Sequence, residues 1–493
     1  MPIYVVDEDI YKQRPSIIIG TVDKFAMLAW NPEARALFNI GEQGEQLASP
    51  PGLIIQDELH LISGPLGSMV GLYESVIDEL CTARNDNGTI VPKIIASTAT
   101  ARNYQEQIKT LFGRTSKQTA IFPPHGLEEG HSFFAEPEVS DDGTPTPGKR
   151  YLGIFSASLG STQTVQVRVA AATLQAAYTI PEEDRDGYWT NLNYFNSLRE
   201  LGNTVTLLQS DVRDYLKGMQ RSDGFSTIRW PERILELTSR ISNQDIPDSI
   251  EKLETSYSSA DNKAIDICLA SNIIEVGIDI DRLALMTIVG QPKTTAQYIQ
   301  VSGRVGRKPK QAPGLVITIY GASKPRDRSH FERFQTYHEQ LYAQVEPTSS
   351  TPFARPALKR ALHAAIIGYI RQTGPIKRDP YPFPEKEFNH AAKLVWDRAS
   401  LADCETLKDL HEQIDDLRQN WRAWEKTEWK KDQREPDDNN NYLMRPAGTQ
   451  DVLGEVPMVW DIPTSMRTVD AECHLKITSL YNREDGETKR END

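Results

Sequence analysis

Two arginines, Arg304 and Arg307, lie three residues apart within the pattern Gln300-x-x-Gly303-Arg304-x-Gly306-Arg307. Guanidinium groups grip phosphate oxygens in a bidentate manner and keep their charge at physiological pH. Glycine lets a backbone come close to a ligand. A lone Arg-Gly pair is typical of a basic turn, but this five-position pattern predicts a phosphate-binding site.

Two adjacent carboxylates, Asp57 and Glu58, follow an apolar run at residues 53–55 and precede His60. A phosphoryl-transfer site needs one carboxylate to hold Mg²⁺, usually through water, and another to position and deprotonate the attacking water. The same residues are also typical of a helix start, where acidic side chains favour the positive end of the dipole. Taken alone, the tetrapeptide leaves both interpretations open.

Small hydroxyl residues follow two further apolar runs. Ser97 and Thr98 come directly after residues 94–96, and Gly20 and Thr21 come after residues 17–19. Backbone N–H groups and a small hydroxyl can contact a phosphate without reading base sequence. A strand that ends in an ordinary Ser/Thr turn, or a helix cap at Thr21, would have the same sequence.

Taken together, these segments resemble the motifs of superfamily 2 helicases. Residues 17–25 resemble motif Ib, 57–60 motif II, 94–100 motif III, 192–199 motif IV, 270–279 motif V and 300–307 motif VI. The resemblance implies an ATP-hydrolysing cleft between two lobes, with ATP and Mg²⁺ as cofactors and nucleic acid, DNA favoured, as partner. It places motifs II and III on one wall of the cleft and motif VI on the other.

The resemblance also implies a role for each matching residue. Asp57 would hold Mg²⁺ through water, Glu58 would activate the attacking water, and His60 would sit beside Gln300 and report the nucleotide state. Arg304 and Arg307 would stabilise the transition state. The other residues implied near the nucleotide are Thr98, Gly277, Asp279 and Gly303. Those implied at the nucleic-acid backbone are Gly20, Thr21, Asn196 and Ser271.

Several longer phrases, at residues 56–67, 122–127 and 463–470, look like the DrmA-type helicases of DISARM anti-phage systems. Members of that group carry a long N-terminal region with a phosphate loop. No G-x-x-x-x-G-K-[ST] sequence occurs in these 493 residues, and that loop normally cradles the β- and γ-phosphates. We therefore expect negligible ATP hydrolysis by this chain alone and a separate polypeptide that supplies the loop, with other defence-system subunits as further partners. The alternative is a catalytically inactive module that binds nucleic acid or a partner.

The elements that must position these residues follow an α/β pattern, because short apolar runs alternate with helical periodicity. Candidate strands cover residues 16–19, 53–55, 93–96, 191–194, 204–208, 265–269, 285–289 and 315–320. By resemblance we expect two RecA-like lobes with parallel sheets, the first N-terminally incomplete, plus a mainly helical C-terminal region. We expect the incomplete first lobe at residues 1–135 and a loop and bridging helix at 136–187. The second lobe is expected at 188–325 and the helical C-terminal region at 326–493.

Composition sets outer limits on function. The chain has 55 basic and 69 acidic residues, a net charge of −14, which argues against a surface that binds nucleic acid all over. Its four cysteines are far apart, so neither a disulfide framework nor a zinc site is indicated and a cytoplasmic location is expected. A charged helix expected at 401–431 carries Trp421, Trp424 and Trp429. These could stack on bases, but a packed helical face is favoured.

Overall fold

The structure, a computed structural model, forms two compact units. Unit 1 comprises residues 1–120 and 348–493, and unit 2 comprises residues 121–347. The described residues are 2–86, 88–98, 103–124, 133–134, 136, 138–144, 146, 148–157, 161–238, 240–242, 245–257, 264–271, 279–347, 349–430, 441–449 and 458–467. Within them, no helix is both long enough and apolar enough to span a bilayer.

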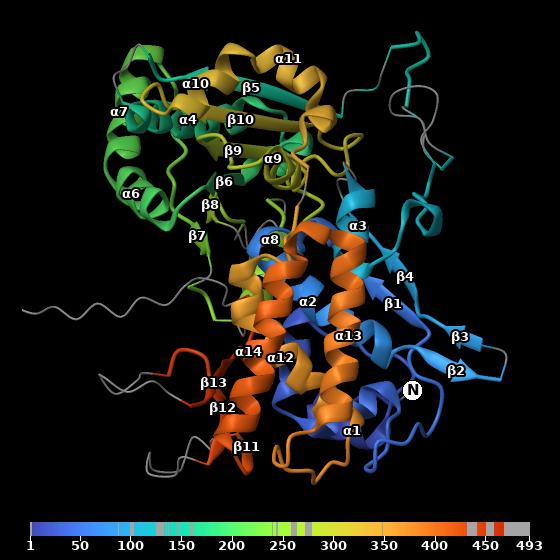
Figure 1. The fold of residues 1–493 in the computed structure, drawn as a ribbon. Helices are drawn as coiled ribbons and strands as arrows, with labels where there is room; N and C mark the ends of the chain where they lie inside the picture. The colour runs from blue at the N-terminus through green and yellow to red at the C-terminus, as the bar shows by residue number, and fades with distance from the viewer. Residues whose placement is uncertain are drawn as a thin grey trace, which may run out of the picture. The chain divides into compact units, whose positions relative to one another are not determined.

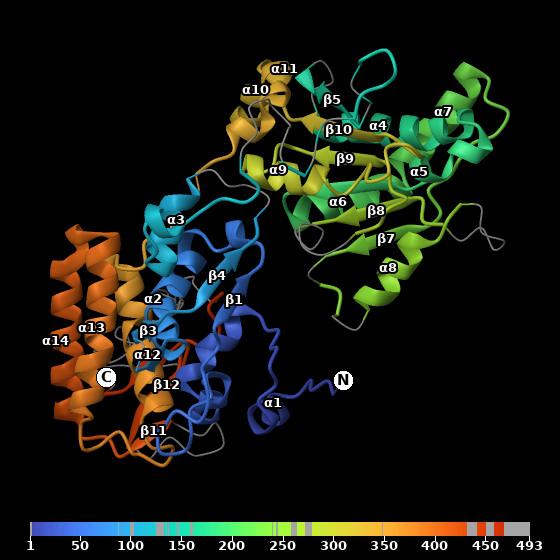
Figure 2. The same cartoon turned by 90° about the vertical axis from the view of Figure 1, so that its right-hand side faces the viewer.

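Unit 2 is built on a six-stranded sheet in which every pair is parallel, in the order β5-β10-β9-β6-β8-β7 (Figures 1 and 2). Its strands are β5 (Lys149–Phe155), β6 (Asn191–Phe195), β7 (Ile234–Leu237), β8 (Ile267–Ala270), β9 (Leu285–Val289) and β10 (Gly314–Tyr320). Its helices are α4 (Thr162–Ala176), α5 (Asp186–Trp189), α6 (Leu198–Gln209), α7 (Asp211–Asp223), α8 (Ile246–Glu254), α9 (Thr295–Ser302), α10 (Pro325–Glu332) and α11 (Phe334–Glu339).

Both faces of this sheet are buried, as expected for parallel strands joined by helical crossovers. On β8, Ile267 packs in one cluster with residues of α4, α6 and α7. The next residue, Cys268, packs in a different cluster with residues of α8 and α9. Successive side chains of a strand point to opposite faces, so the near-continuous apolar sequence of β8 and β9 follows from burial on both sides.

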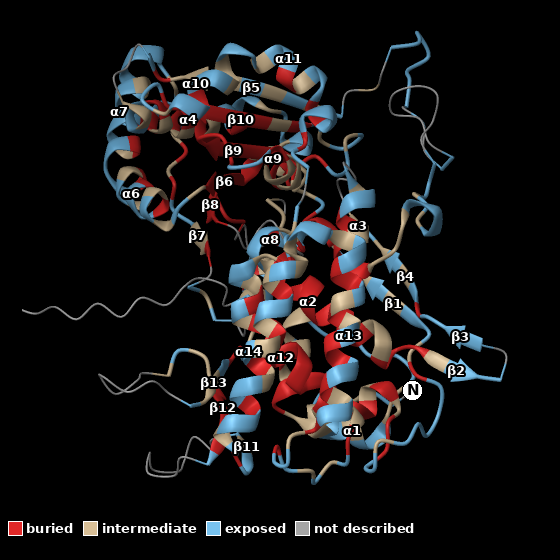
Figure 3. Cartoon of the chain, in the orientation of Figure 1, coloured by how far each residue is buried: buried red, intermediate tan, exposed pale blue. Residues whose placement is uncertain are grey.

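Unit 1 is mainly helical, and its core surrounds α12 (Figure 3). Its helices are α1 (Asp7–Gln13), α2 (Gly64–Leu80), α3 (Tyr104–Phe112), α12 (Arg355–Thr373), α13 (Glu385–Ala402) and α14 (Leu407–Trp424), with 3-10 turns η1 (Val22–Ala29), η2 (Pro32–Phe38) and η3 (Leu59–Leu61). Its strands are the parallel pair β1 (Leu53–Gln56) and β4 (Lys93–Ala96), the hairpin β2 (Ala83–Asn85) and β3 (Gly88–Ile90), and a parallel sheet of β11 (Glu428–Lys430), β12 (Tyr442–Pro446) and β13 (Trp460–Ile462).

The predicted α/β class, with parallel sheets and a mainly helical C-terminal region, is confirmed. Two predicted strands are wrong. Residues 204–208 lie inside α6, which begins at an N-cap, Ser197, whose side chain accepts a hydrogen bond from the Glu200 N–H. Residues 16–19 form no strand, and Ile17 and Ile19 are 70% and 94% exposed. The sequence interpretation also missed β5 and β7.

The boundaries between the parts of the chain differ from those expected. The expected bridging segment, 136–187, contributes β5 and α4 to the sheet and core of unit 2. The expected C-terminal region, 326–493, is divided: α10 and α11 belong to unit 2, whereas α12, α13 and α14 complete the core of unit 1. The physical reason is that α2 and α12 are apolar on most sides and bury each other.

The helix expected at 401–431 ends at Trp424, and Trp429 lies on β11. The Trp421 ring is fully buried, and its indole N–H donates to the Pro380 carbonyl at 3.0 Å. Its ring lies edge-on to Trp429 and Trp460. Packing therefore accounts for Trp421, as the favoured interpretation predicted.

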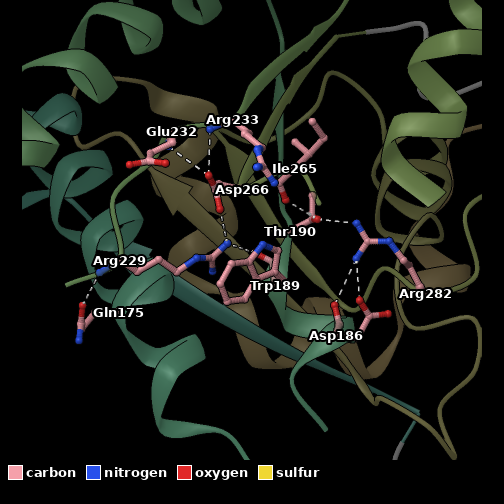
Figure 4. Close-up of polar contacts among 10 residues, drawn as sticks. All are labelled: Gln175, Asp186, Trp189, Thr190, Arg229, Glu232, Arg233, Ile265, Asp266 and Arg282. Carbon is pink, nitrogen blue, oxygen red and sulfur yellow. Dashed lines mark hydrogen bonds and ion pairs between the residues drawn. The ribbon is translucent and has the colours of Figure 1, made fainter. Parts of the chain in front are cut away.

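A buried polar network closes the amino-terminal end of the unit 2 sheet at β6, β7 and β8 (Figure 4). Arg229 is 2% exposed, forms an ion pair with Asp266 at 2.9 Å and lies 3.5 Å from the centre of the Trp189 ring. Asp266 Oδ2 also accepts from the Glu232 and Arg233 backbone N–H groups. Because both charges are paired and hydrogen-bonded, this network holds the start of β8 against the loop that precedes β7.

Candidate functional site

In unit 1, the predicted motif II and motif III residues meet at the carboxyl ends of β1 and β4. The parallel register pairs Gln56 with Ala96, so Asp57 and Ser97 emerge side by side. Ser97 Oγ donates a hydrogen bond to Asp57 Oδ1, and the Leu59 N–H donates to the Ser97 carbonyl at 2.8 Å. Ligands collect at the carboxyl ends of strands in open α/β sheets, so this is where a site is expected.

Glu58 stands in a left-handed conformation, with φ 50° and ψ 50°. Such a conformation is costly for a residue other than glycine and is often found at functional sites. Its backbone N–H donates to Asp57 Oδ1 at 3.0 Å, and its side chain is 41% exposed. The turn therefore presents the Glu58 carboxylate to solvent beside Asp57.

His60 is buried behind these carboxylates, with a side chain only 4% exposed. Its Nδ1 atom lies 3.2 Å from Thr98 Oγ1 and 3.4 Å from Glu58 Oε2. The ring thus connects the turn after β1 to the turn after β4. Asp57, Glu58, His60 and Thr98, all predicted from the sequence, come together in one cluster.

Two members of this cluster were not among the predicted site residues. Ser97 holds the Asp57 carboxylate, and the signal for it was its place directly after an apolar run beside Thr98. Gln107 on α3 is 4% exposed and donates from Nε2 to the Leu59 and Ile62 carbonyls at 3.1 and 3.0 Å. Its contacts span more than forty residues of sequence, and no local pattern indicates them.

The donor set fits Mg²⁺ bound mainly through water. Asp57 is exposed and offers hard oxygen ligands. Among the described residues, no group of three or more His, Cys, Asp or Glu side chains could enclose a metal ion. Mg²⁺ commonly retains several waters and binds one or two carboxylates together with substrate phosphates, which matches a site of this kind.

In unit 2, the predicted arginines follow α9 and converge on one carboxylate. Arg304 Nη1 lies 2.6 Å, and Arg307 Nη2 2.5 Å, from the same oxygen, Asp279 Oδ1. Asp279 was expected near the nucleotide; its side chain is half exposed, at 56%, and binds both guanidinium groups. Two guanidinium groups on one anionic oxygen form a geometry that a phosphate oxygen can also occupy.

A third cation, Lys149 at the start of β5, belongs to the same neighbourhood. Burial, and then the positive charge of Arg307, lower the pKa of Lys149. The residues around Lys149 do not form a phosphate-loop sequence, so no local pattern indicates a role for it. Pairing of β5 with β10, which was not predicted, is what brings it close to Arg307.

The two glycines of the motif differ in backbone conformation. Gly306 has φ +67°, and a Cβ atom there would stand 2.6 Å from Gly314 Cα. Gly303 follows α9 with an ordinary helical φ of −65°. Gly306 is therefore needed for its left-handed conformation and for its close approach to Gly314, whereas a Cβ atom at Gly303 would meet milder contacts, 3.1 Å from the Ile299 carbonyl oxygen. Gln300 lies half-buried on α9, three residues before Gly303.

The residues predicted at the nucleic-acid backbone differ in exposure and in hydrogen bonding. Gly20 and Thr21 are exposed, next to the start of η1. Ser271 is 5% exposed at the end of β8. Asn196 Nδ2 donates to the Val289, Gly290 and Gln291 carbonyls at 3.1 to 3.4 Å, so its donor already holds the end of β9. Gly277 lies outside the described residues.

Comparison with known proteins finds helicase relatives. Residues 209–309, which include the arginine motif, match the helicase conserved C-terminal domain. The chain is also 40% identical to DISARM protein DrmA of Bacillus paralicheniformis over 455 residues, which are 85% of this chain and 40% of that protein. The chain is therefore similar to helicase-family proteins.

More distant relatives include ATP-dependent helicase HRQ1 of Saccharomyces cerevisiae, 23% identical over 303 residues, which are 58% of this chain and 23% of that protein. This chain therefore spans less than half the length of either curated relative. Among solved structures, that of the DUF1998 helicase MrfA bound to DNA matches with a TM-score of 0.49 and 18% identity, covering 75% of this chain and 44% of that one.

Proposed function

We propose that this chain forms part of an ATP-dependent helicase or translocase acting on nucleic acid, DNA favoured, in anti-phage defence. The observation that carries the proposal is the convergence of Arg304 and Arg307 on a single carboxylate oxygen. In the proposed reaction these arginines leave Asp279 and bind the phosphate charge of ATP. The defence role rests on similarity to DISARM protein DrmA, and the cytoplasmic location rests on widely spaced cysteines, three of which are free thiols.

In this proposal the carboxylates of unit 1 bind Mg²⁺ and activate the attacking water. Asp57 holds Mg²⁺ through water, and Glu58 positions and deprotonates the water that attacks the γ-phosphate. Mg²⁺, when bound, neutralises charge that develops on the phosphate oxygens. His60, which bonds to both Thr98 and Glu58, orients the Glu58 carboxylate.

The phosphate loop is proposed to come from polypeptide outside these 493 residues. Parallel sheets are normally covered on both faces, yet the β1–β4 pair is open. Leu53, Ile55 and Ile95 are 49%, 68% and 49% exposed. An exposed apolar face on a two-stranded parallel sheet is suited to receive further strands and helices, and these would bring the loop next to Asp57.

ATP hydrolysis in the presence of Mg²⁺ and single-stranded DNA tests the proposal. We expect negligible turnover by the chain alone, and turnover after adding the part of DrmA that lies outside the region of similarity. Glu58→Gln should then lower the rate about 10²-fold or more, since it removes the general base. Arg307→Ala should lower it roughly 10³-fold. Glu106→Gln, on exposed α3 residue Glu106, serves as the charge-matched control.

Two results would redirect the proposal. Robust hydrolysis by the single chain, lost in Glu58→Gln, would show that no external loop is needed. Binding of nucleic acid without any hydrolysis, even with the added polypeptide, would favour the second candidate function, a helicase-like module that binds nucleic acid or a partner. The engagement of Asn196 Nδ2 is the observation that favours this alternative, because a predicted phosphate contact is used for structure instead.

A further inference from the structure

An open hollow of about 670 Å³ lies within unit 1, away from the residues discussed above. Its walls are the first turns of α12, the exposed side of α14, and the chain on either side of the β12–β13 connection. No sequence motif indicated it, because its lining comes from three separate segments, at residues 355–363, 413–420 and 447–463. It belongs to the C-terminal helical region, where the sequence favoured packing over base stacking for the tryptophans.

Three cationic side chains, Arg355, Lys359 and Arg360, line the hollow from α12. Arg355 and Lys359 are exposed, and neither forms an ion pair with any residue that the structure describes. Arg355 is the first residue of the helix, and no acidic side chain occupies its first turn. Cations near a helix N-terminus oppose the helix dipole, so helix stability does not account for this placement.

Acidic groups only partly offset these charges. Asp461 lines the hollow, but its Oδ1 atom already binds Arg445 Nε at 2.7 Å. Asp416 is the other carboxylate of the lining. His363 adds no charge near neutral pH, because burial lowers its pKa. The hollow is thus locally basic on a chain whose net charge is −14.

The remaining walls offer groups that suit bases. Gln413 and Asn420 present amides from α14, and Trp460 presents an indole ring. The Trp460 ring is fixed by packing 4.9 Å from the Trp424 ring. Rigid aromatic rings and amides beside cations are the groups with which proteins hold single-stranded nucleic acid.

We propose that this hollow binds the sugar-phosphate backbone of a single nucleic-acid strand, with Arg355 and Lys359 on the phosphates and Trp460 against a base. The inference rests on the proposed function and adds a contact outside the helicase motifs. It explains how an acidic chain can hold a polyanion: the cations are concentrated at one place, not spread over the surface.

Binding of a fluorescein-labelled oligo(dT) strand, measured by anisotropy at several salt concentrations, tests this site. We expect Arg355→Gln/Lys359→Gln to weaken binding roughly tenfold and to reduce the slope of log affinity against log salt by about 1.4, since each phosphate contact on a single strand contributes about 0.7. The matched control is Lys386→Gln/Lys393→Gln, which removes the same charge from exposed positions on α13. Trp460→Leu should weaken binding without changing the slope.

The outcomes separate the site from the function. Equal affinities for the hollow and control variants, both binding like the unaltered chain, would overturn the site and leave the proposed function standing. No binding by the unaltered chain would overturn both. Displacement of the strand by tripolyphosphate at equal phosphate concentration would show that the hollow takes free polyphosphate and would overturn the strand assignment. Equal thermal midpoints of the two variants exclude unfolding as the cause of a loss.

Discussion

Residues that follow short apolar strands were the most predictable part of the candidate site. Asp57, Glu58, His60 and Thr98 were predicted together, and the structure brings them together because β1 and β4 are parallel and in register. Lys149 was not among the predicted residues, because its place beside Arg307 depends on a strand pairing that the local sequence does not reveal. Their catalytic roles stay predictions until turnover is measured.

Glu74 on α2 gives the stability of unit 1 a dependence on pH. Burial is the main cause that raises its pKa from the usual 4.5 to about 7, with Arg398 acting in the opposite direction. Between these values the folded chain keeps a proton that the unfolded chain releases. The free energy of unfolding therefore falls as pH rises through this window, by roughly 3 kcal/mol in all.

Glu74→Gln should remove this dependence. Relative to the unaltered chain, the variant should gain stability as the pH increases from 5 to 8, measured by urea unfolding at each pH. Glu106→Gln, an exposed change in the same unit, should leave the profile unaltered. A constant difference between Glu74→Gln and the unaltered chain across this range would contradict the assignment of the proton to Glu74.

The ion pair in Figure 4 makes a second stability prediction at the residue scale. Asp266→Asn leaves Arg229 buried without a counter-charge, and breaking such a pair typically costs about 3–5 kcal/mol. We expect a loss of that order in the free energy of unfolding of unit 2, followed by Trp189 fluorescence. Asp214→Asn on the exposed side of α7 should have no measurable effect.

At the scale of elements, the sequence was most reliable where a strand contains a short apolar run. β4 and β9 were predicted with the observed ends, and β1, β6, β8 and β10 to within two residues. Residues 204–208 failed because a short apolar run fits a strand as well as a helix. The decisive signal was seven residues earlier, at Ser197 and Glu200, where the helix starts.

The turn between α9 and β10 yields a prediction from two glycines of one motif. Gly306→Ala forces a side chain into a left-handed conformation and against Gly314, so we expect it to destabilise unit 2 by about 1–2 kcal/mol or more. Gly303→Ala should lower the thermal midpoint less than Gly306→Ala does, because its φ is helical and its Cβ would stand 3.1 Å from the Ile299 carbonyl oxygen, not 2.6 Å from a Cα atom. A loss of stability in Gly303→Ala equal to that in Gly306→Ala would show that the turn geometry is not the cause.

At the scale of the whole molecule, the least predictable feature is that unit 1 is discontinuous. Residues 348–493 pack with residues 1–120, and α12 lies in the same hydrophobic core as α2. A chain ending at residue 347 should therefore leave residues 1–120 unfolded while unit 2 keeps its sheet. Hydrogen exchange would show fast exchange in α2 and protection in β6, β8 and β9. Protection of α2 in the shortened chain would contradict this dependence.

Because unit 1 is formed by two separate parts of the chain, those parts are translated at different times. The apolar face of α2 leaves the ribosome before the 227 residues of unit 2 have been translated, and its partner α12 comes only after them. Residues 81–354 separate α2 from α12, so at about 5–20 residues per second α2 waits for roughly 14–55 seconds. During that interval an exposed apolar helix is a target for aggregation or for a chaperone that binds nascent chains. Slow translation across residues 121–347 would lengthen the exposure, so yield in the cell should depend on elongation rate even when the finished protein is stable.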